Sequence, residues 1–218
     1  MNPSFSSDWS RAWSDRRFRW EFAFTLCLAG AALASLSTFL EFVEDRPGVV
    51  LLDPFVNRIA PAQLTWLTFA LIYAGLAVGV WSLARHPRTL VVALQSYTLM
   101  IGIRILMMFV VPLNPPTGLI PLADPFVQFF GSGRVPTRDL FFSGHVSTLF
   151  LLSLCARNKV LKLLFLALTL TVAVVVLWQH VHYTIDVMVA PFVAYASYRM
   201  VTLAHDQLSS KNIQPEND

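Results

Sequence analysis

The sequence predicts an all-α, polytopic membrane protein: a six-transmembrane helix bundle with both termini in the cytoplasm. Of its 218 residues, 56% are hydrophobic and only 13% are charged, and the mean hydropathy is +0.59. A soluble domain of this size carries more charge and fewer apolar residues. The Lys and Arg residues are scattered between apolar runs and form no patch, so the basic pI near 9.1 does not indicate nucleic-acid binding.

Six apolar stretches define the expected spans. They cover residues 22–42, 63–84, 90–112, 142–156, 160–178 and 184–203. Because a spanning helix needs about 20 residues, the short fourth stretch is expected to begin below the membrane surface and to face a cavity. We therefore expect a basic and aromatic cytoplasmic tail (1–20), a six-helix membrane catalytic domain (21–204) and a cytoplasmic C-terminal tail (205–218).

The N-terminal tail combines aromatic residues with arginines. Trp9, Trp13, Phe18 and Trp20 alternate there with four arginines. This mixture suits an interfacial helix. A disordered tail ahead of the first span is the alternative that the sequence leaves open.

The distribution of basic residues predicts the orientation. Counted over alternate connections, eleven Lys and Arg residues lie on the side of the N-terminal tail and four on the other, with Arg104 inside the third stretch. By the positive-inside rule both termini are cytoplasmic. The connections 41–62 and 111–141 then face the opposite side, and they are long and rich in proline. Connections of this length in a compact chain are usually functional.

Three ionisable residues mark the candidate catalytic centre. His145 lies at the start of the fourth stretch, and His182 and Asp186 lie at the start of the sixth. Two spans separate the two starts, so the chain returns to the same surface and the histidines can meet. His182 and Asp186 have the i, i+4 spacing of one helical face, with Asp186 one turn deeper. The carboxylate can then fix the imidazole tautomer and leave the other ring nitrogen as nucleophile or base.

Other residues near this surface suit phosphate binding. Gly144 permits close approach of a ligand to the backbone, and a helix that starts there offers free amide groups to an anion. Ser143 is suited to cap that helix and to touch the anion. Arg104, with Arg134 and Arg138, would neutralise the charge of a phosphoryl transition state.

The headgroup of a substrate is not fixed by the sequence. Asp53 and Asp139 suit a primary ammonium. Tyr183 together with Trp66, Trp178, Phe141 and Phe142 would box a quaternary ammonium by cation–π contact. An interfacial aromatic belt would contain the same residues. Choline and ethanolamine both remain open.

Two motifs carry a family resemblance. Ser143-Gly144-His145 and the segment from His182 to Val187 (His-Tyr-Thr-Ile-Asp-Val) resemble the sphingomyelin synthase branch of the type 2 phosphatidic acid phosphatase (PAP2) superfamily. The family pattern pairs Asp-x-x-x-Ser-Gly-His, which begins here at Asp139, with His-Tyr-Thr-x-Asp-Val. Residues 51–55 and 104–112 are similar to two further motifs of that branch.

The resemblance implies roles for the three candidate residues. His182 would attack phosphorus, Asp186 would orient and charge it, and His145 would act as acid and base. It also implies six spans, a site facing the lumen or the exterior, and neither a metal nor another cofactor. Phosphatases of the superfamily usually carry Pro before Ser-Gly-His and an Arg upstream of the last His. Phe142 stands in place of that Pro and no such Arg precedes His182, which favours the transferase branch.

Two enzymatic functions follow as expectations. The first is a transferase of the sphingomyelin synthase or ceramide phosphoethanolamine synthase type, which moves a phospho-alcohol headgroup from a glycerophospholipid to ceramide, diacylglycerol or a similar lipid alcohol through a phosphohistidine. The alternative is a lipid phosphate phosphatase or phospholipase C-like hydrolase, in which water replaces the acceptor at the same site. Both place a multi-pass protein in the membrane with its active site on the non-cytoplasmic face, and an oligomer is compatible with either. A non-catalytic scaffold would leave the His182 and Asp186 pair unexplained.

Overall fold

A computed structural model describes residues 5–123 and 135–211, and within these ranges the chain is helical. The elements are α1 (Phe5–Ser14), α2 (Arg16–Asp45), the short 3-10 helix η1 (Val56–Arg58), α3 (Thr65–Leu83), α4 (Pro87–Val110), α6 (Gly144–Cys155), α7 (Lys159–Trp178) and α8 (Thr184–Lys211). Among the described residues, α2, α3, α4, α7 and α8 are long and apolar enough to cross a membrane. These helices fit the integral membrane protein that the sequence predicted.

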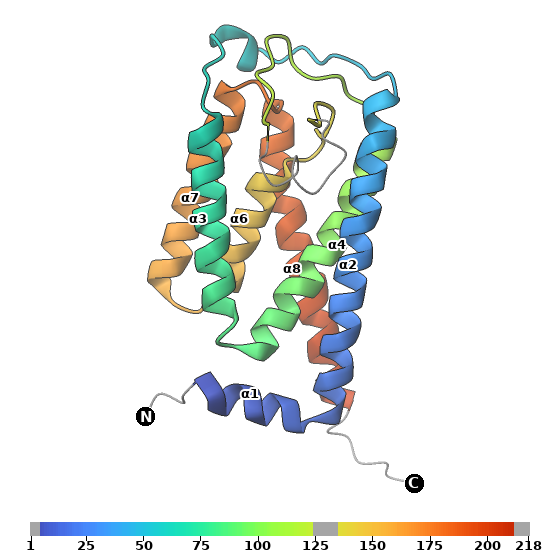
Figure 1. Ribbon diagram of the computed structural model, residues 1–218, viewed down its shortest axis with the longest axis vertical. Helices are drawn as coiled ribbons and strands as arrows, with labels where there is room; N and C mark the ends of the chain where they lie inside the picture. Colours follow the sequence, from blue (N-terminus) through green and yellow to red (C-terminus); the bar gives the residue numbers. More distant parts are fainter. Residues whose placement is uncertain (1–4, 124–134, 212–218) are drawn as a thin grey trace.

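The sixth expected span corresponds to α6, which has 12 residues and is about 18 Å long at 1.5 Å per residue. It packs against α3, α4, α7 and α8 in the interior of the bundle. Figure 1 shows that α6 begins deeper in the bundle than the neighbouring ends of α7 and α8. A helix enclosed in this way does not need to reach both membrane surfaces, because protein rather than lipid surrounds its ends.

The bundle has two distinct ends (Figure 1). The segments 46–64, 111–123 and 135–143 gather at one end, which we call the loop end. Helix α1 lies across the opposite end, where α8 also ends, and we call this the terminus end. The starts of α6 and α8 therefore point toward the loop end.

Apolar side chains both fill the bundle and cover it. Val146, Phe165 and Val176 are almost completely buried between α6, α7 and α8. Phe24 and Phe192 lie on outer faces with 68% and 75% of their surface exposed. Large apolar side chains that point outward from long helices suit a lipid environment.

Two arginines close helix ends at the loop end. The Arg46 guanidinium donates to the carbonyl oxygens of Met108 and Phe109 at 2.6 and 2.9 Å, in the last turn of α4. The Arg138 guanidinium donates to the carbonyl oxygens of Glu44 and Arg46, at the end of α2. Carbonyl groups in the last turn of a helix have no partner within it, so both arginines satisfy them and complement the helix dipole.

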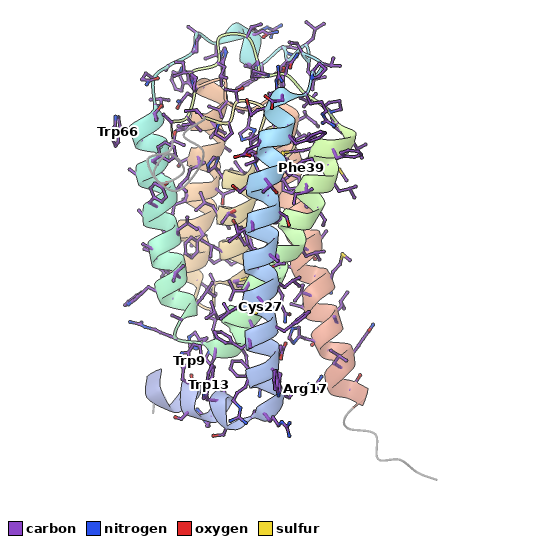
Figure 2. All side chains as sticks on the ribbon, turned by 45° about the vertical axis from the view of Figure 1, so that its right-hand side comes forward. Trp9, Trp13, Arg17, Cys27, Phe39 and Trp66 are labelled. Carbon is purple, nitrogen blue, oxygen red and sulfur yellow. The ribbon has the colours of Figure 1, made fainter. Side chains whose placement is uncertain are left out.

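The N-terminal tail forms helix α1 and packs on the terminus end. The Trp9 indole N–H donates to the Ala84 carbonyl, just after α3, at 2.7 Å. Trp9 also packs edge-on against Phe18 and Phe22 at the start of α2. Figure 2 shows Trp9 and Trp13 between α1 and the bundle. Of the two alternatives for the tail, the structure shows a helix.

Candidate active site

The starts of α6 and α8 are joined directly. The Ser143 amide donates to the Asp186 carbonyl at 3.1 Å. This bond brings His145 opposite His182, with ring centroids 6.5 Å apart and ring planes inclined by 67°. At this separation the two rings do not bond to each other directly.

His182 and Asp186 form a buried pair. Nδ1 of His182 lies 3.3 Å from Oδ2 of Asp186, and the exposed fractions of the two side chains are 1% and 0%. A carboxylate on Nδ1 orients the ring and stabilises its protonated form. The arrangement leaves Nε2 as the reactive atom.

The contact between His182 and Asp186 does not come from two positions on one helical face, as the i, i+4 spacing predicted. Helix α8 begins at Thr184, so His182 lies in the turn before the helix and not in its first turn. Asp186 is the third helical residue, and its Oδ2 also accepts from the Tyr183 amide at 3.0 Å. A carboxylate at this position commonly reaches back to the residue that precedes the helix. The helix start therefore positions the carboxylate, and the turn brings His182 onto it.

Arg104 lies against the start of α6. A Cβ atom at Gly144 would collide with the Arg104 guanidinium, so the close approach that Gly144 permits is made by this side chain. Nη2 of Arg104 pairs with Oδ1 of Asp139 at 2.6 Å, and 12% of the Arg104 side chain is exposed. Its Nε is buried and has no hydrogen-bond partner among the described residues.

The Ser143 hydroxyl does not cap α6, contrary to the prediction from the sequence. Ser143 is the N-cap residue of α6, but its side chain makes no capping hydrogen bond. Its Oγ is buried and lacks a partner within the described part of the chain. Buried polar atoms in folded proteins usually have a hydrogen-bond partner, so this hydroxyl is suited to contact a ligand. With the free amides of the first turn of α6, this hydroxyl can serve a bound anion.

A cavity of about 210 Å³ opens beside these groups. Its polar end is formed by Arg104, Asp139 and His145, and the remainder is mainly apolar and aromatic: Leu36, Ile72, Tyr73, Leu76, Tyr97, Met100, Ile101 and Leu149. Sequence reasoning missed Tyr97, although it precedes Arg104 by two helical turns and therefore shares its face of α4. Leu36 and Tyr73 lie on other helices, so their spacing in the sequence gave no indication that they line this cavity.

The C-terminal part of the chain matches a known family. Residues 138–205 match the family model of the PAP2 superfamily C-terminal domain. The match supports membership of the PAP2 superfamily. His145, His182 and Asp186 all lie within the matched residues. No curated protein matches the chain. The match indicates an enzyme that acts on phosphate groups, of the lipid phosphatase or phosphotransferase type.

Asp53 lies outside the cavity lining of this candidate site. Its Oδ2 accepts from the Thr184 amide at 2.6 Å, and its Oδ1 accepts from the Thr184 hydroxyl and from the amides of Phe55 and Val56. Burial acts to raise the pKa of this carboxyl, but these hydrogen bonds outweigh it and lower the pKa from its ordinary value of 3.8. Asp53 thus caps the helix that carries Asp186.

Two further binding candidates also hold the loop end together. The Tyr183 hydroxyl donates to the Asn114 carbonyl at 2.8 Å and accepts from the Leu51 amide at 3.2 Å. Arg138 closes α2, as described above. Neither residue lines the cavity. Arg134 lies outside the described residues.

Of the aromatic residues considered for a cation box, Phe141 packs against the buried cluster that contains Tyr183, whereas Trp66 and Trp178 lie outside it. Tyr183 and Phe142 are buried, with exposed fractions of 1% and 0%. Trp66 and Trp178 are exposed by 79% and 47%. Figure 2 shows Trp66 pointing away from the bundle at the start of α3. The two tryptophans have the position of an interfacial belt.

Proposed function

We propose that this protein is a lipid phosphotransferase that moves a phospho-alcohol headgroup from a glycerophospholipid to a lipid alcohol such as ceramide or diacylglycerol. The observation that carries the proposal is the buried His182 and Asp186 pair, which faces His145 beside an amphipathic cavity. The match of this region to the PAP2 superfamily supports phosphoryl chemistry.

In the first half of the reaction, Nε2 of His182 attacks the phosphorus of the donor lipid. The bond from phosphorus to the diacylglycerol oxygen breaks, and His145 gives that oxygen a proton. Diacylglycerol leaves, and the headgroup phosphate stays on His182 as a phosphohistidine. Asp186 stabilises the positive charge on the His182 ring through Nδ1.

In the second half, the acceptor hydroxyl enters the position that diacylglycerol has left. His145, now neutral, takes the hydroxyl proton while the oxygen attacks phosphorus. The bond from phosphorus to nitrogen breaks and His182 returns to its starting state. Atoms and protons balance, because His145 first loses and then regains one proton.

Charge at phosphorus would be held by Arg104 and the start of α6. The Arg104 guanidinium is the cationic group of the cavity lining and lies against Gly144, and the buried Ser143 hydroxyl precedes Gly144 at the start of α6. Donors preset at the place where charge develops stabilise a phosphoryl transition state. Asp139 holds Arg104 in place, so a bound phosphate exchanges with, or shares, this partner.

The cavity supports a lipid as substrate. Away from Arg104 and His145 it is lined by Leu36, Leu76 and Met100 among others, which suit an acyl chain more than a second polar group. The deep burial of His182 and Asp186 also favours transfer over hydrolysis, because water has little access to the phosphohistidine.

We further propose that the loop end faces the non-cytoplasmic side. Most of the basic residues lie toward the terminus end, which the positive-inside rule places in the cytoplasm. In this topology α6 acts as the sixth membrane segment, completed at the loop end by residues 135–143.

The test uses purified protein in mixed micelles with phosphatidylcholine or phosphatidylethanolamine labelled in the phosphate, with and without ceramide. We expect the label to appear on ceramide with release of diacylglycerol. Release of diacylglycerol with label only on a water-soluble headgroup phosphate would show a hydrolase. Absence of any product with either donor would contradict the proposal.

A further inference from the structure

A second charged cavity lies at the terminus end, far from the candidate catalytic residues. It has a volume of about 360 Å³, within the range of small-molecule sites. Three elements that are distant in sequence form its lining: α1, the start of α4, and the connection between α6 and α7. None of its lining residues belongs to the site described above.

Basic side chains dominate this cavity. Arg11 from α1, Arg88 from α4 and Arg157 from the α6–α7 connection all line it, and Asp8 is the acidic residue of the lining. Asp8 pairs with Arg11 at 2.6 Å. Two arginines therefore remain without an acidic side chain in the lining. Arg88 lies 3.4 Å from Asp15, but the two side chains are 75% and 41% exposed, and a pair this accessible to solvent contributes little.

His86 reinforces this charge pattern. Nη1 of Arg157 donates to Nδ1 of His86 at 3.0 Å. Burial lowers the pKa of His86 from its ordinary value of 6.5, and Arg157 and Arg85 lower it further, against a smaller opposing effect of Asp8. The ring is therefore neutral at pH 7 and accepts from Arg157, which holds that guanidinium beside the cavity.

The backbone adds donors of the same polarity. Pro87 and Arg88 begin α4, and the N-cap residue His86 makes no side-chain capping bond to its amides. By contrast, Asp15 and Asn158 cap α2 and α7 with side-chain oxygens. Pro87 has no amide hydrogen and the Leu90 amide donates to the His86 carbonyl, so the first turn of α4 offers the amides of Arg88 and Thr89. Both residues line the cavity, and their amides and the arginines together favour a multiply charged oxyanion.

The surroundings place this cavity at the level of lipid headgroups. Trp81, near the end of α3, is 61% exposed, and the Arg85 guanidinium stacks on its ring at 3.6 Å. Trp13 on α1 is 46% exposed. Tryptophans of this kind sit at the membrane–water interface, and basic pockets between helices at that level bind anionic headgroups.

We propose that Arg11, Arg88 and Arg157 form a binding site for the headgroup phosphate of an anionic phospholipid in the leaflet at the terminus end. The bound phosphate bridges α1, α4 and the α6–α7 connection. This site is separate from the proposed catalytic site. Phospholipid binding here therefore does not depend on which reaction the catalytic site performs.

The experiment titrates the purified full-length protein in neutral detergent with phosphatidylglycerol and counts retained lipids by native mass spectrometry. We expect wild type to retain phosphatidylglycerol in preference to phosphatidylcholine. Loss of one arginine that binds the phosphate should cost about 1 kcal/mol, roughly five-fold in affinity, so the double substitution Arg88→Gln and Arg157→Gln is expected to weaken retention about 30-fold.

A matched control removes the same charge elsewhere. Arg19 and Arg199 are exposed and line none of the cavities at this end. The double substitution Arg19→Gln and Arg199→Gln should change retention less than about two-fold. Equal losses in the two double variants would show general electrostatic attraction and would overturn the site.

Lipid retention by an Asp8→Asn variant and stabilisation by inorganic phosphate test the site further. Asp8→Asn removes the competing carboxylate and should strengthen retention about five-fold, and this variant retains all three arginines. Unchanged or weaker retention would contradict the proposal. Inorganic phosphate is the last probe: if it stabilises wild type as strongly as the lipid does at equal concentration, the site serves a soluble anion and the lipid assignment is wrong.

Discussion

Gly144 and Arg104 meet at the polar end of the catalytic cavity. The absence of a side chain at Gly144 leaves the space in which the Arg104 guanidinium lies against the start of α6. In this position the guanidinium borders both His145 and the free amides of the helix. The glycine therefore acts through the arginine, by fixing where its positive charge lies.

Replacing Gly144 by alanine should displace this charge. We expect Gly144→Ala to lower kcat/KM about 100-fold, the effect of removing one preset donor from a transition state. Gly102→Ala is the control, because nothing lies within 4 Å of a Cβ atom at Gly102, on the same helix as Arg104. Equal activity of the two variants would show that the position of Arg104 is unimportant for turnover.

Asp53 gives a prediction for stability against pH. Its pKa is lower in the folded chain than in the unfolded chain, so the ionised carboxylate stabilises the fold above pH 3.8. That contribution is lost as the pH falls through the lowered pKa. Asp53→Asn should destabilise the protein by about 1 kcal/mol at pH 7.

The difference between Asp53→Asn and wild type should shrink at low pH. Thermal unfolding in detergent, followed by circular dichroism between pH 7 and pH 3, measures it. A difference that stays constant or grows toward pH 3 would contradict the role of the ionised carboxylate.

The sequence alone predicted the meeting of His145, His182 and Asp186, since the number of spans between them is even and their spacing is short. It did not predict the capping role of Asp53 or the loop contacts of Tyr183. Such roles depend on which distant backbone groups a side chain meets, and local patterns do not contain that information. Asp53 and Tyr183 were candidates for substrate binding because they lie near the motifs. In the structure their side chains form hydrogen bonds mainly with backbone groups.

At the scale of elements, the starts of α6 and α8 form one unit. The Ser143 amide bonds to the Asp186 carbonyl, while Asp186 and Asp53 satisfy amides at the start of α8. The two helix starts point the same way, so their positive dipole ends lie at the same end of the bundle as the two histidines. Arg138 and Arg46 in turn satisfy the ends of α2 and α4 beside them.

Arg104 and Arg138 were both predicted from the sequence to bind phosphate, but their substitution should affect different properties of the protein. Arg138→Gln removes charged hydrogen bonds to helix-end carbonyls and should cost about 1–3 kcal/mol, or several degrees in Tm, with little effect on KM. Arg104→Gln should instead lower kcat/KM by at least about 100-fold, with a smaller change in Tm.

Both variants are compared in the same detergent by thermal unfolding and by the lipid transfer assay. An Arg138→Gln protein with wild-type Tm and greatly reduced kcat/KM would reverse this assignment and place Arg138 at the phosphate.

At the scale of the whole molecule, the lengths of the apolar stretches predicted the long helices, and the hydrophobic composition predicted a membrane protein. Five of the six expected stretches are candidate spans in the described residues, with ends that differ by several residues from the apolar runs. Helix α2 begins at Arg16 and α8 continues to Lys211, because helices extend past the apolar region into polar flanks. The packing of α6 in the interior could not be read from its composition, which resembles that of its lipid-facing neighbours.

Labelling of single cysteines tests the proposed topology. Leu52 is 92% exposed at the loop end, and Ser210 is exposed near the end of α8. In a chain with Cys27 and Cys155 replaced, Leu52→Cys should react with a membrane-impermeant maleimide on intact cells. Ser210→Cys should react only after permeabilisation. The opposite pattern would place the site on the cytoplasmic face.

The most direct measurement of the central claim is the covalent state of His182 after exposure to donor lipid without acceptor. Mass spectrometry of the peptide that contains His182 should show the headgroup phosphate on this residue, and later addition of ceramide should remove it. His182→Ala should show no adduct at any site. A modified His145, or release of diacylglycerol with no adduct at any time after mixing, would contradict His182 as the nucleophile.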